Sequence, residues 1–172
     1  RMLEPLPVPH CKLSNKSFRF RLPNDADRYI GIGQTGSGKT QAGIWQLSSR
    51  SYDLMPWIIL DFKRDELIEG IPGTKPLSLT APIPDDPGIY IVRPHPQAGE
   101  DDTLSNFLMR VWEHENCGLF VDEGYMLGLY NSWFNAILTQ GRSKRIPCIV
   151  LTQRPKFVTT FAFSEAQYFQ VF

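Results

Sequence analysis

The feature of this sequence that most constrains its fold is the octapeptide Gly-Gln-Thr-Gly-Ser-Gly-Lys-Thr at residues 33–40. It fits the pattern G-x-x-x-x-G-K-[ST] at every fixed position. An apolar strand is predicted immediately before it, at 29–32, and a helix immediately after it, at 39–49. Because strands and helices that alternate in this way build parallel sheets, the octapeptide predicts the first strand-loop-helix unit of an α/β protein.

The same residues have the chemistry of a phosphate-binding loop. Glycines let backbone N–H groups turn inward around phosphate oxygens, and the N-terminus of the following helix adds its positive end. We expect Lys39 to reach the β and γ phosphates of ATP and Thr40 to ligate Mg²⁺, so ATP and Mg²⁺ are the predicted cofactors. The predicted nucleotide-binding residues are Gly33, Gln34, Thr35, Gly36, Ser37, Gly38, Lys39 and Thr40.

The rest of the chain predicts further strands that alternate with helices. Continuous apolar runs are typical of strands buried on both faces of a parallel sheet. Such runs lie at 57–60, 89–92, 117–121, 148–151 and 168–172. Apolar residues at helical spacing follow Asp102 or Thr103 as N-cap, and another helix is predicted over 133–143. The predicted fold class is α/β, with a mainly parallel sheet, helices on both faces and ligands at the carboxyl ends of the strands.

A chain of 172 residues is long enough for one core and too short for two ordinary domains. Proline-rich residues 1–17 predict an extended arm, and 18–172 the domain, which begins with an edge strand at 18–21. No apolar run approaches the roughly 20 residues of a membrane-spanning helix, so no membrane role is predicted. The three cysteines cannot all pair, which favours a reducing compartment such as the cytoplasm.

Hydrolysis needs a carboxylate site in addition to the phosphate-binding loop. Asp122 and Glu123 follow the apolar run at 117–121. We expect Asp122 to hold the water shell of Mg²⁺, and Glu123 to activate the attacking water as general base. Gln153 follows the run at 148–151, and its neutral amide can hydrogen-bond both the γ-phosphate and the water without adding charge.

Charge is unevenly distributed along a chain whose net charge is zero. Residues 140–156 hold five bases and no acid, whereas residues 85–123 hold nine acids and two arginines. Two differently charged faces are typical of subunits that meet head to tail. An arginine supplied across such a boundary neutralises charge on a transferring phosphoryl group, and the candidates in order are Arg142, Arg154 and Arg145.

Three segments resemble the FtsK-HerA superfamily of DNA-pumping ATPases. They are Asp61-Phe62-Lys63 followed by Glu66-Leu67, Val121-Asp122-Glu123, and Leu151-Thr152-Gln153-Arg154-Pro155. The Thr-Gln-Arg-Pro ending is the most specific part, because in the FtsK branch a similar quartet closes the strand after a helix that bears an arginine, as Arg142 does here. The resemblance spans residues 29–172 and implies a RecA-like P-loop ATPase. In such a sheet the strand that ends at Gln153 lies between the strand of the phosphate-binding loop and that of Asp122.

The resemblance also implies a ring, expected to hold six subunits, with double-stranded DNA threaded through it. The sequence departs from the cellular translocases of this superfamily, because it has no membrane anchor or winged-helix tail and Phe62 replaces their usual proline. It is therefore most similar to the genome-packaging ATPases of viruses and phages. That similarity implies a capsid or portal protein as a further partner, and a location in the host cytoplasm or the virion.

Two other functions are compatible with these residues. An ATPase that acts on protein, in morphogenesis, secretion or assembly, would use the same hydrolytic site. A small-molecule kinase would need a lid and an acceptor pocket, which the sequence does not suggest, and it would not account for Gln153. Basic pore loops would favour DNA, and the candidates are Lys63 with Arg64, residues 93–95, and Lys144 with Arg145.

Overall fold

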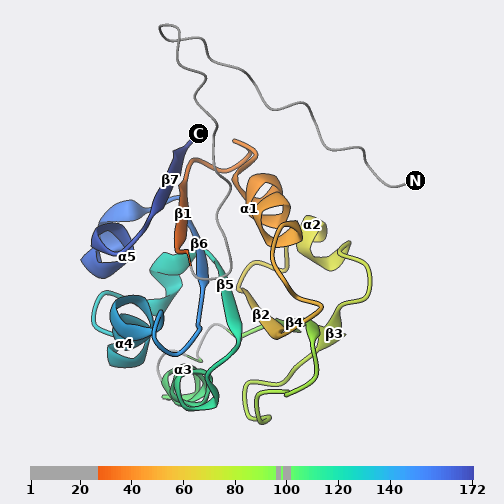
Figure 1. Ribbon diagram of the computed structural model, residues 1–172. Helices are drawn as coiled ribbons and strands as arrows, with labels where there is room; N and C mark the ends of the chain where they lie inside the picture. The colour runs from red at the N-terminus through yellow and green to blue at the C-terminus, as the bar shows by residue number, and fades with distance from the viewer. Residues whose placement is uncertain (1–26, 96–97, 99–101) are drawn as a thin grey trace, which may run out of the picture.

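The computed structural model describes residues 27–95, 98 and 102–172, so the predicted arm at 1–17 and edge strand at 18–21 lie outside the described residues. Within the described part, seven parallel strands form one sheet in the order β3-β4-β2-β5-β6-β1-β7 (Figure 1). The strands are β1 Tyr29–Ile32, β2 Pro56–Asp61, β3 Lys75–Pro76, β4 Gly88–Val92, β5 Gly118–Asp122, β6 Cys148–Thr152 and β7 Tyr168–Val171. The predicted α/β class is confirmed.

Helices cover both faces of this sheet, as predicted. In Figure 1, α1 and α2 lie on one side of the sheet, and α3, α4 and α5 lie on the other. Their bounds are α1 Lys39–Ser48, α2 Glu66–Glu69, α3 Thr103–His114, α4 Ser132–Gln140 and α5 Thr160–Ser164, with short 3-10 helices η1 Gly124–Leu127 and η2 Pro155–Phe157. Among the described residues, no helix combines the length and the apolar character needed to cross a membrane.

Each face of the sheet has its own hydrophobic core. Along β2, Ile58 and Leu60 belong to the core under α3, α4 and α5, whereas Trp57 and Ile59 belong to the core under α1. All four side chains are fully buried. Successive side chains of a strand point to opposite faces, so a strand covered on both sides must be apolar throughout, which is the physical reason for the continuous run at 57–60.

The helix predicted over 133–143 ends earlier, at Gln140. Gly141 is the C-cap of this helix. The N–H of Ile146 donates to the carbonyl of Gly141 at 2.8 Å, and this turn leads the chain back towards β6. Arg142 therefore lies in the turn after α4 and not on the helix itself. The strand β3 and the helices α2 and α5 were not predicted, because elements of two to five residues are too short to give a periodic pattern.

The strand order brings the chemistry-bearing segments to one edge of the sheet. β6 lies between β1 and β5, as the resemblance implied, and β2 lies on the other side of β5. Because all these strands are parallel, the loops that follow them meet at a single carboxyl edge. That edge carries the phosphate-binding loop after β1, Gln153 after β6, Glu123 after β5 and Lys63 after β2.

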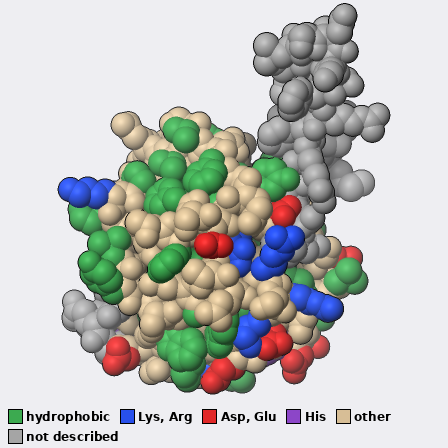
Figure 2. Space-filling view, turned by 60° about the vertical axis from the view of Figure 1, so that its left-hand side comes forward, with side chains coloured by type: hydrophobic (Ala, Val, Ile, Leu, Met, Phe, Trp, Pro, Cys, Tyr) green, Lys and Arg blue, Asp and Glu red, His purple; other side chains and the backbone are tan. Residues whose placement is uncertain are grey.

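Apolar side chains are exposed at the β7 side of the sheet. Phe157, Phe161, Phe169 and Val171, from η2, α5 and β7, are all exposed. Figure 2, in which this side is turned towards the viewer, shows hydrophobic side chains gathered on the surface. Among the described residues, β7 is also an edge strand and pairs with β1 alone. An exposed apolar surface on an edge strand is typical of a protein interface.

Candidate active site

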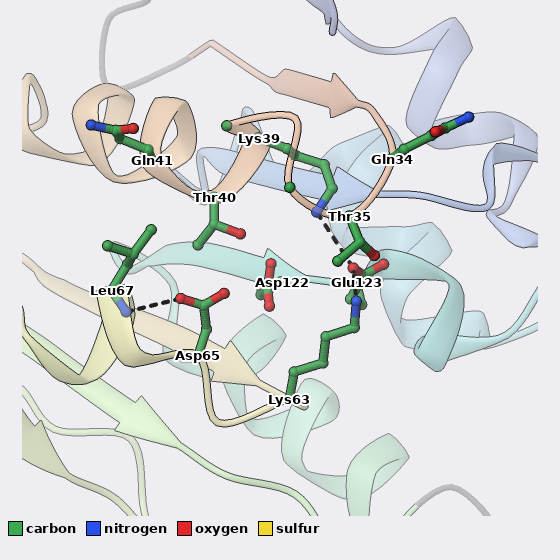
Figure 3. A pocket seen from close by; sticks show the side chains of 12 residues that line it. Gln34, Thr35, Lys39, Thr40, Gln41, Lys63, Asp65, Leu67, Asp122 and Glu123 are labelled. Atoms are coloured by element: carbon green, nitrogen blue, oxygen red, sulfur yellow. Dashed lines mark hydrogen bonds and ion pairs between the residues drawn. The ribbon is translucent and has the colours of Figure 1, made fainter.

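The carboxyl edge of the sheet contains a cleft of about 300 Å³. Its walls are the phosphate-binding loop and first turn of α1, the end of β5, and the loop after β2 (Figure 3). In the close view, the side chains of Thr40, Asp65 and Asp122 point into the middle of the cleft, and those of Lys39 and Lys63 converge on Glu123. The predicted site residues at 33–40, 122 and 123 therefore meet in one place.

The backbone of the loop explains its glycines. Gly36 and Gly38 have φ angles of 80° and 87°, in the left-handed region that side-chain-bearing residues rarely adopt. A Cβ atom at either position would meet no neighbour, so the requirement comes from the backbone conformation and not from space. The N–H of Gly33 donates to the carbonyl of Thr152 at 3.2 Å, which holds the start of the loop against β6.

Lys39 and Glu123 form a buried ion pair. Their side chains are 6% and 1% exposed, and Lys39 Nζ lies 3.4 Å from Glu123 Oε1. The second oxygen, Glu123 Oε2, accepts a hydrogen bond from the backbone N–H of Gln153 at 3.2 Å. Glu123 also has a φ of 68°, which is uncommon for a residue with a side chain and is a conformation that clusters at functional sites.

Asp122 is a buried acidic residue of the site whose charge is not compensated by hydrogen bonds from the described part of the chain. It is 1% exposed, and neither of its carboxylate oxygens has a hydrogen-bond partner among the described residues. Burial raises the pKa of Asp122 from 3.8 to about 6, although nearby Lys39 acts in the opposite direction. A buried carboxylate without a partner is costly unless a cation binds it. Asp122 and Thr40 therefore fit a hard divalent cation such as Mg²⁺, which prefers oxygen ligands.

Gln153 links the phosphate-binding loop to β6. The hydroxyl of Thr35 donates to Gln153 Oε1 at 2.6 Å. Together with Gln34 and Arg154, these two residues line a second opening beside the cleft. The guanidinium carbon of Arg154 lies 5.2 Å from the centre of the Tyr125 ring, a cation-π geometry that fixes the arginine at this opening.

The other two candidate arginines lie at the opposite edge of the sheet. Arg142 and Arg145 are in the turn between α4 and β6, before the amino end of β6, and both are exposed. Neither lines the cleft of its own chain. Lys144 of the same turn pairs with Glu115. Arg142 can therefore contact a nucleotide only if that nucleotide is bound to another subunit, and this role stays a prediction.

Four residues that line the cleft were not predicted to belong to it, namely Gln41, Lys63, Asp65 and Leu67. Lys63, a candidate pore-loop residue in the sequence, contacts Glu123 Oε1, and Asp65 lines the cleft opposite Thr40. Lys63 and Asp65 reach the cleft because β2 pairs with β5, with Asp61 beside Asp122. Residues that follow neighbouring parallel strands meet at the same edge. Arg93, another pore-loop candidate, pairs with Asp61 at 3.2 Å and with Glu69 at 3.5 Å.

The fold and the site together define a class. An all-parallel sheet carries a glycine-rich loop with a buried lysine after one strand, an Asp-Glu pair at the end of a second strand, and an amide just after the strand between them. These are the parts of a P-loop NTPase with its own hydrolytic carboxylate.

Comparison with known proteins finds a homologue within that class. No protein-family model matches the sequence. The chain is 43% identical over 153 residues to the DNA packaging ATPase P9 of Enterobacteria phage PRD1. The match covers 89% of this chain and 66% of the length of P9. The chain is therefore a homologue of P9 that spans slightly less than two thirds of the length of P9.

Solved structures agree on the fold. The genome packaging NTPase B204 of Sulfolobus turreted icosahedral virus 2, in complex with AMPPCP, superposes with a TM-score of 0.60 at 18% identity, over 87% of this chain and 76% of B204. B204 from Sulfolobus turreted icosahedral virus, a DNA-packaging ATPase, gives a TM-score of 0.57 at 18% identity, over 86% and 75% of the two chains. At this identity the likeness establishes the fold alone.

Proposed function

We propose that this chain is the ATP-hydrolysing motor that packages the double-stranded DNA genome of a virus or phage, working as a ring of six subunits of the FtsK-HerA kind. One observation carries the hydrolytic part of the proposal. Glu123 is buried at the junction of β5, β6 and the phosphate-binding loop, within reach of both Lys39 and Gln153. A general base must lie at such a junction to reach the water that attacks the γ-phosphate.

The residues of the cleft divide the chemistry among them. Lys39 and the loop amides would hold the phosphates, and Thr40 and Asp122 would hold Mg²⁺, which would neutralise charge on the phosphates. Glu123 accepts the proton of the attacking water. Gln153 orients that water, and its contact with Thr35 ties its side chain to the phosphate-binding loop. ATP binding and the position of Gln153 are therefore coupled.

DNA as the substrate is supported by the homology to P9, a DNA packaging ATPase. A ring is supported by the exposed apolar surface of η2, α5 and β7, and by the position of Arg142. Exposed at the edge away from its own cleft, Arg142 is suited to act on the nucleotide of a neighbouring subunit. Such a motor would work at a capsid or portal protein, in the host cytoplasm or within the virion.

The test is the rate of ATP hydrolysis with and without duplex DNA, measured together with the mass of the assembly in solution. Stimulation by duplex DNA and a six-subunit mass are the expected results. A matched Lys39→Ala protein should be inactive in both conditions, which excludes a contaminating ATPase. If a partner protein stimulates hydrolysis and DNA does not, the chain acts on protein, as the alternative function requires.

A further inference from the structure

Thr35 makes a side-chain contact that ties the phosphate-binding loop to the end of the strand before Gln153. Its hydroxyl donates to Gln153 Oε1 at 2.6 Å. The backbone N–H of Gln153 donates in turn to Glu123 Oε2 at 3.2 Å. Gln153 is therefore held at its main chain by the proposed general base, and at its side chain by Thr35.

The same strand end also fixes the backbone of the loop just before Thr35. The N–H of Gly33 donates to the carbonyl of Thr152 at 3.2 Å. Thr152 is the last residue of β6 and directly precedes Gln153. A backbone bond and a side-chain bond therefore join the start of the loop to consecutive residues at the end of β6. Because threonine is restricted at χ1, keeping its hydroxyl on Gln153 costs little conformational entropy.

This contact decides which end of the Gln153 amide is left for a nucleotide. A glutamine amide has an oxygen that accepts hydrogen bonds and an NH2 group that donates two. Since Oε1 is engaged by Thr35, the NH2 group is the end that can turn to a phosphate. The oxygens of a γ-phosphate accept hydrogen bonds, so they attract the NH2 group and repel the amide oxygen. Thr35 therefore selects the orientation in which Gln153 can bind a γ-phosphate.

We propose that Thr35 is a positioning residue through which Gln153 distinguishes ATP from ADP. With Thr35 on Oε1, one amide hydrogen of Gln153 binds the γ-phosphate and the other binds the oxygen of the attacking water. ADP has no γ-phosphate and gains nothing from this orientation. The inference rests on the proposed function, and it names the residue that sets the amide of Gln153 before the nucleotide binds.

The test compares the affinities of the wild type and of Thr35→Val for AMPPCP and for ADP, by isothermal titration calorimetry in a buffer with Mg²⁺. Valine keeps the branched shape and removes the hydroxyl. The affinity for AMPPCP should fall about threefold to tenfold, as expected for the loss of one hydrogen bond, while the affinity for ADP stays unchanged. Thr35→Ser, which keeps a hydroxyl, should retain most of the preference for AMPPCP over ADP.

Further variants show whether Thr35 acts through Gln153. Gln153→Ala should lose at least as much affinity for AMPPCP as Thr35→Val. The double variant should bind as Gln153→Ala alone does, because a residue that acts through another has no effect once that other is absent. Thr80→Val, the same change at an exposed threonine whose hydroxyl contacts Ser78, should leave both affinities unaltered.

An equal loss of affinity for AMPPCP and ADP in Thr35→Val would overturn the proposal, because Thr35 would then support the loop itself. No loss for either nucleotide, or additive losses in the double variant, would overturn it as well. Circular dichroism checks the fold of each variant, and Thr35→Ala replaces the valine variant if that protein does not fold. These measurements need neither DNA nor turnover, so a chain that fails as a DNA motor still decides the role of Thr35.

Discussion

At the carboxyl edge of the sheet, Lys39, Asp122 and Glu123 are almost completely buried, whereas at the amino edge Arg142 and Arg145 are exposed to solvent. Burying charge costs folding free energy, and exposed charge costs almost none. The buried charges of the carboxyl edge therefore cost folding free energy, which is expected where these charges bind a ligand.

At the amino edge, Lys144 pairs with Glu115 and Arg145 donates to Asn116 Oδ1 at 3.5 Å. Arg142 makes no such contact among the described residues, which is expected where a second subunit uses it.

The comparison of the two edges predicts the largest loss of hydrolysis rate for a change at the amino edge. If Arg142 neutralises the phosphoryl group bound to a neighbouring subunit, Arg142→Ala should lower the rate of hydrolysis by about 10³. Nucleotide affinity should change little, because Arg142 does not line the cleft of its own chain. Arg145→Ala, in the same turn and equally exposed, is the matched control.

Mixing separates action across the interface from damage to the fold. Arg142→Ala subunits combined with Glu123→Gln subunits should regain hydrolysis, because some interfaces then contain one intact Glu123 and one intact Arg142. If mass measurement finds mixed rings and no mixture is active, Arg142 does not act on a neighbour. Arg154, which lines the opening beside the cleft, would be the next candidate.

A smaller effect, on nucleotide affinity, is expected when Lys39 is changed. Lys39→Ala removes the ammonium group that holds the β and γ phosphates, so ATP affinity should fall by about tenfold to a hundredfold, along with turnover. Isothermal titration calorimetry with a non-hydrolysable nucleotide measures the loss. Equal affinity in the variant and the wild type would contradict the assignment of the phosphate-binding loop. Lys75→Ala, an exposed lysine far from the cleft, should bind as the wild type.

The smallest expected effect is on the free energy of unfolding, which a substitution of Asp122 should raise and not lower. Because burial raises the pKa of Asp122 to about 6, folding favours the protonated carboxyl, and that stabilisation is lost as pH rises through about 6. Without Mg²⁺ and nucleotide, Asp122→Asn should therefore be more stable than the wild type at pH 7, by about 3 kcal/mol, and nearly equal to it at pH 4. Urea unfolding at the two pH values, in a chelating buffer, measures the difference.

With Mg²⁺ and nucleotide present, the order should reverse, because only the wild type retains the carboxylate for the cation. An Asp122→Asn protein that is less stable than the wild type at pH 7 without the ligands would show that Asp122 supports the fold. Such a result would mean that the buried charge at the carboxyl edge does not cost folding free energy, so the two edges would not differ in this respect.

The sequence alone predicted the elements whose pattern lies within a few neighbouring residues. The octapeptide at 33–40 predicted the loop, and apolar runs predicted β1, β2, β4, β5, β6 and β7 to within two residues at each end. Burial on both faces makes the inner strands of the sheet apolar throughout, so they need no periodic pattern. β7 differs, because its Phe169 and Val171 are exposed. The pair Asp122 and Glu123 could be placed beside the loop because strand ends of a parallel sheet share an edge.

The sequence was insufficient where the structure depends on pairing between distant segments. The contact of Lys63 with Glu123 follows from the register of β2 against β5, which no local pattern encodes. The end of α4 at Gln140 follows from the turn at Gly141, whereas the sequence pattern alone extends the helix across Arg142. Whether Arg142 reaches a neighbouring nucleotide depends on the assembly and not on the fold of one chain.

The central claim is that Glu123 activates the water at the carboxyl edge, and Glu123→Gln tests it most directly. The amide is nearly isosteric and Lys39, Thr40 and Asp122 remain, so Mg-ATP binding should be retained while hydrolysis drops by about 10² or more. Glu115→Gln, at the amino edge, should leave hydrolysis within a few-fold of wild type. A Glu123→Gln protein that binds and hydrolyses ATP at the wild-type rate would show that another residue activates the water.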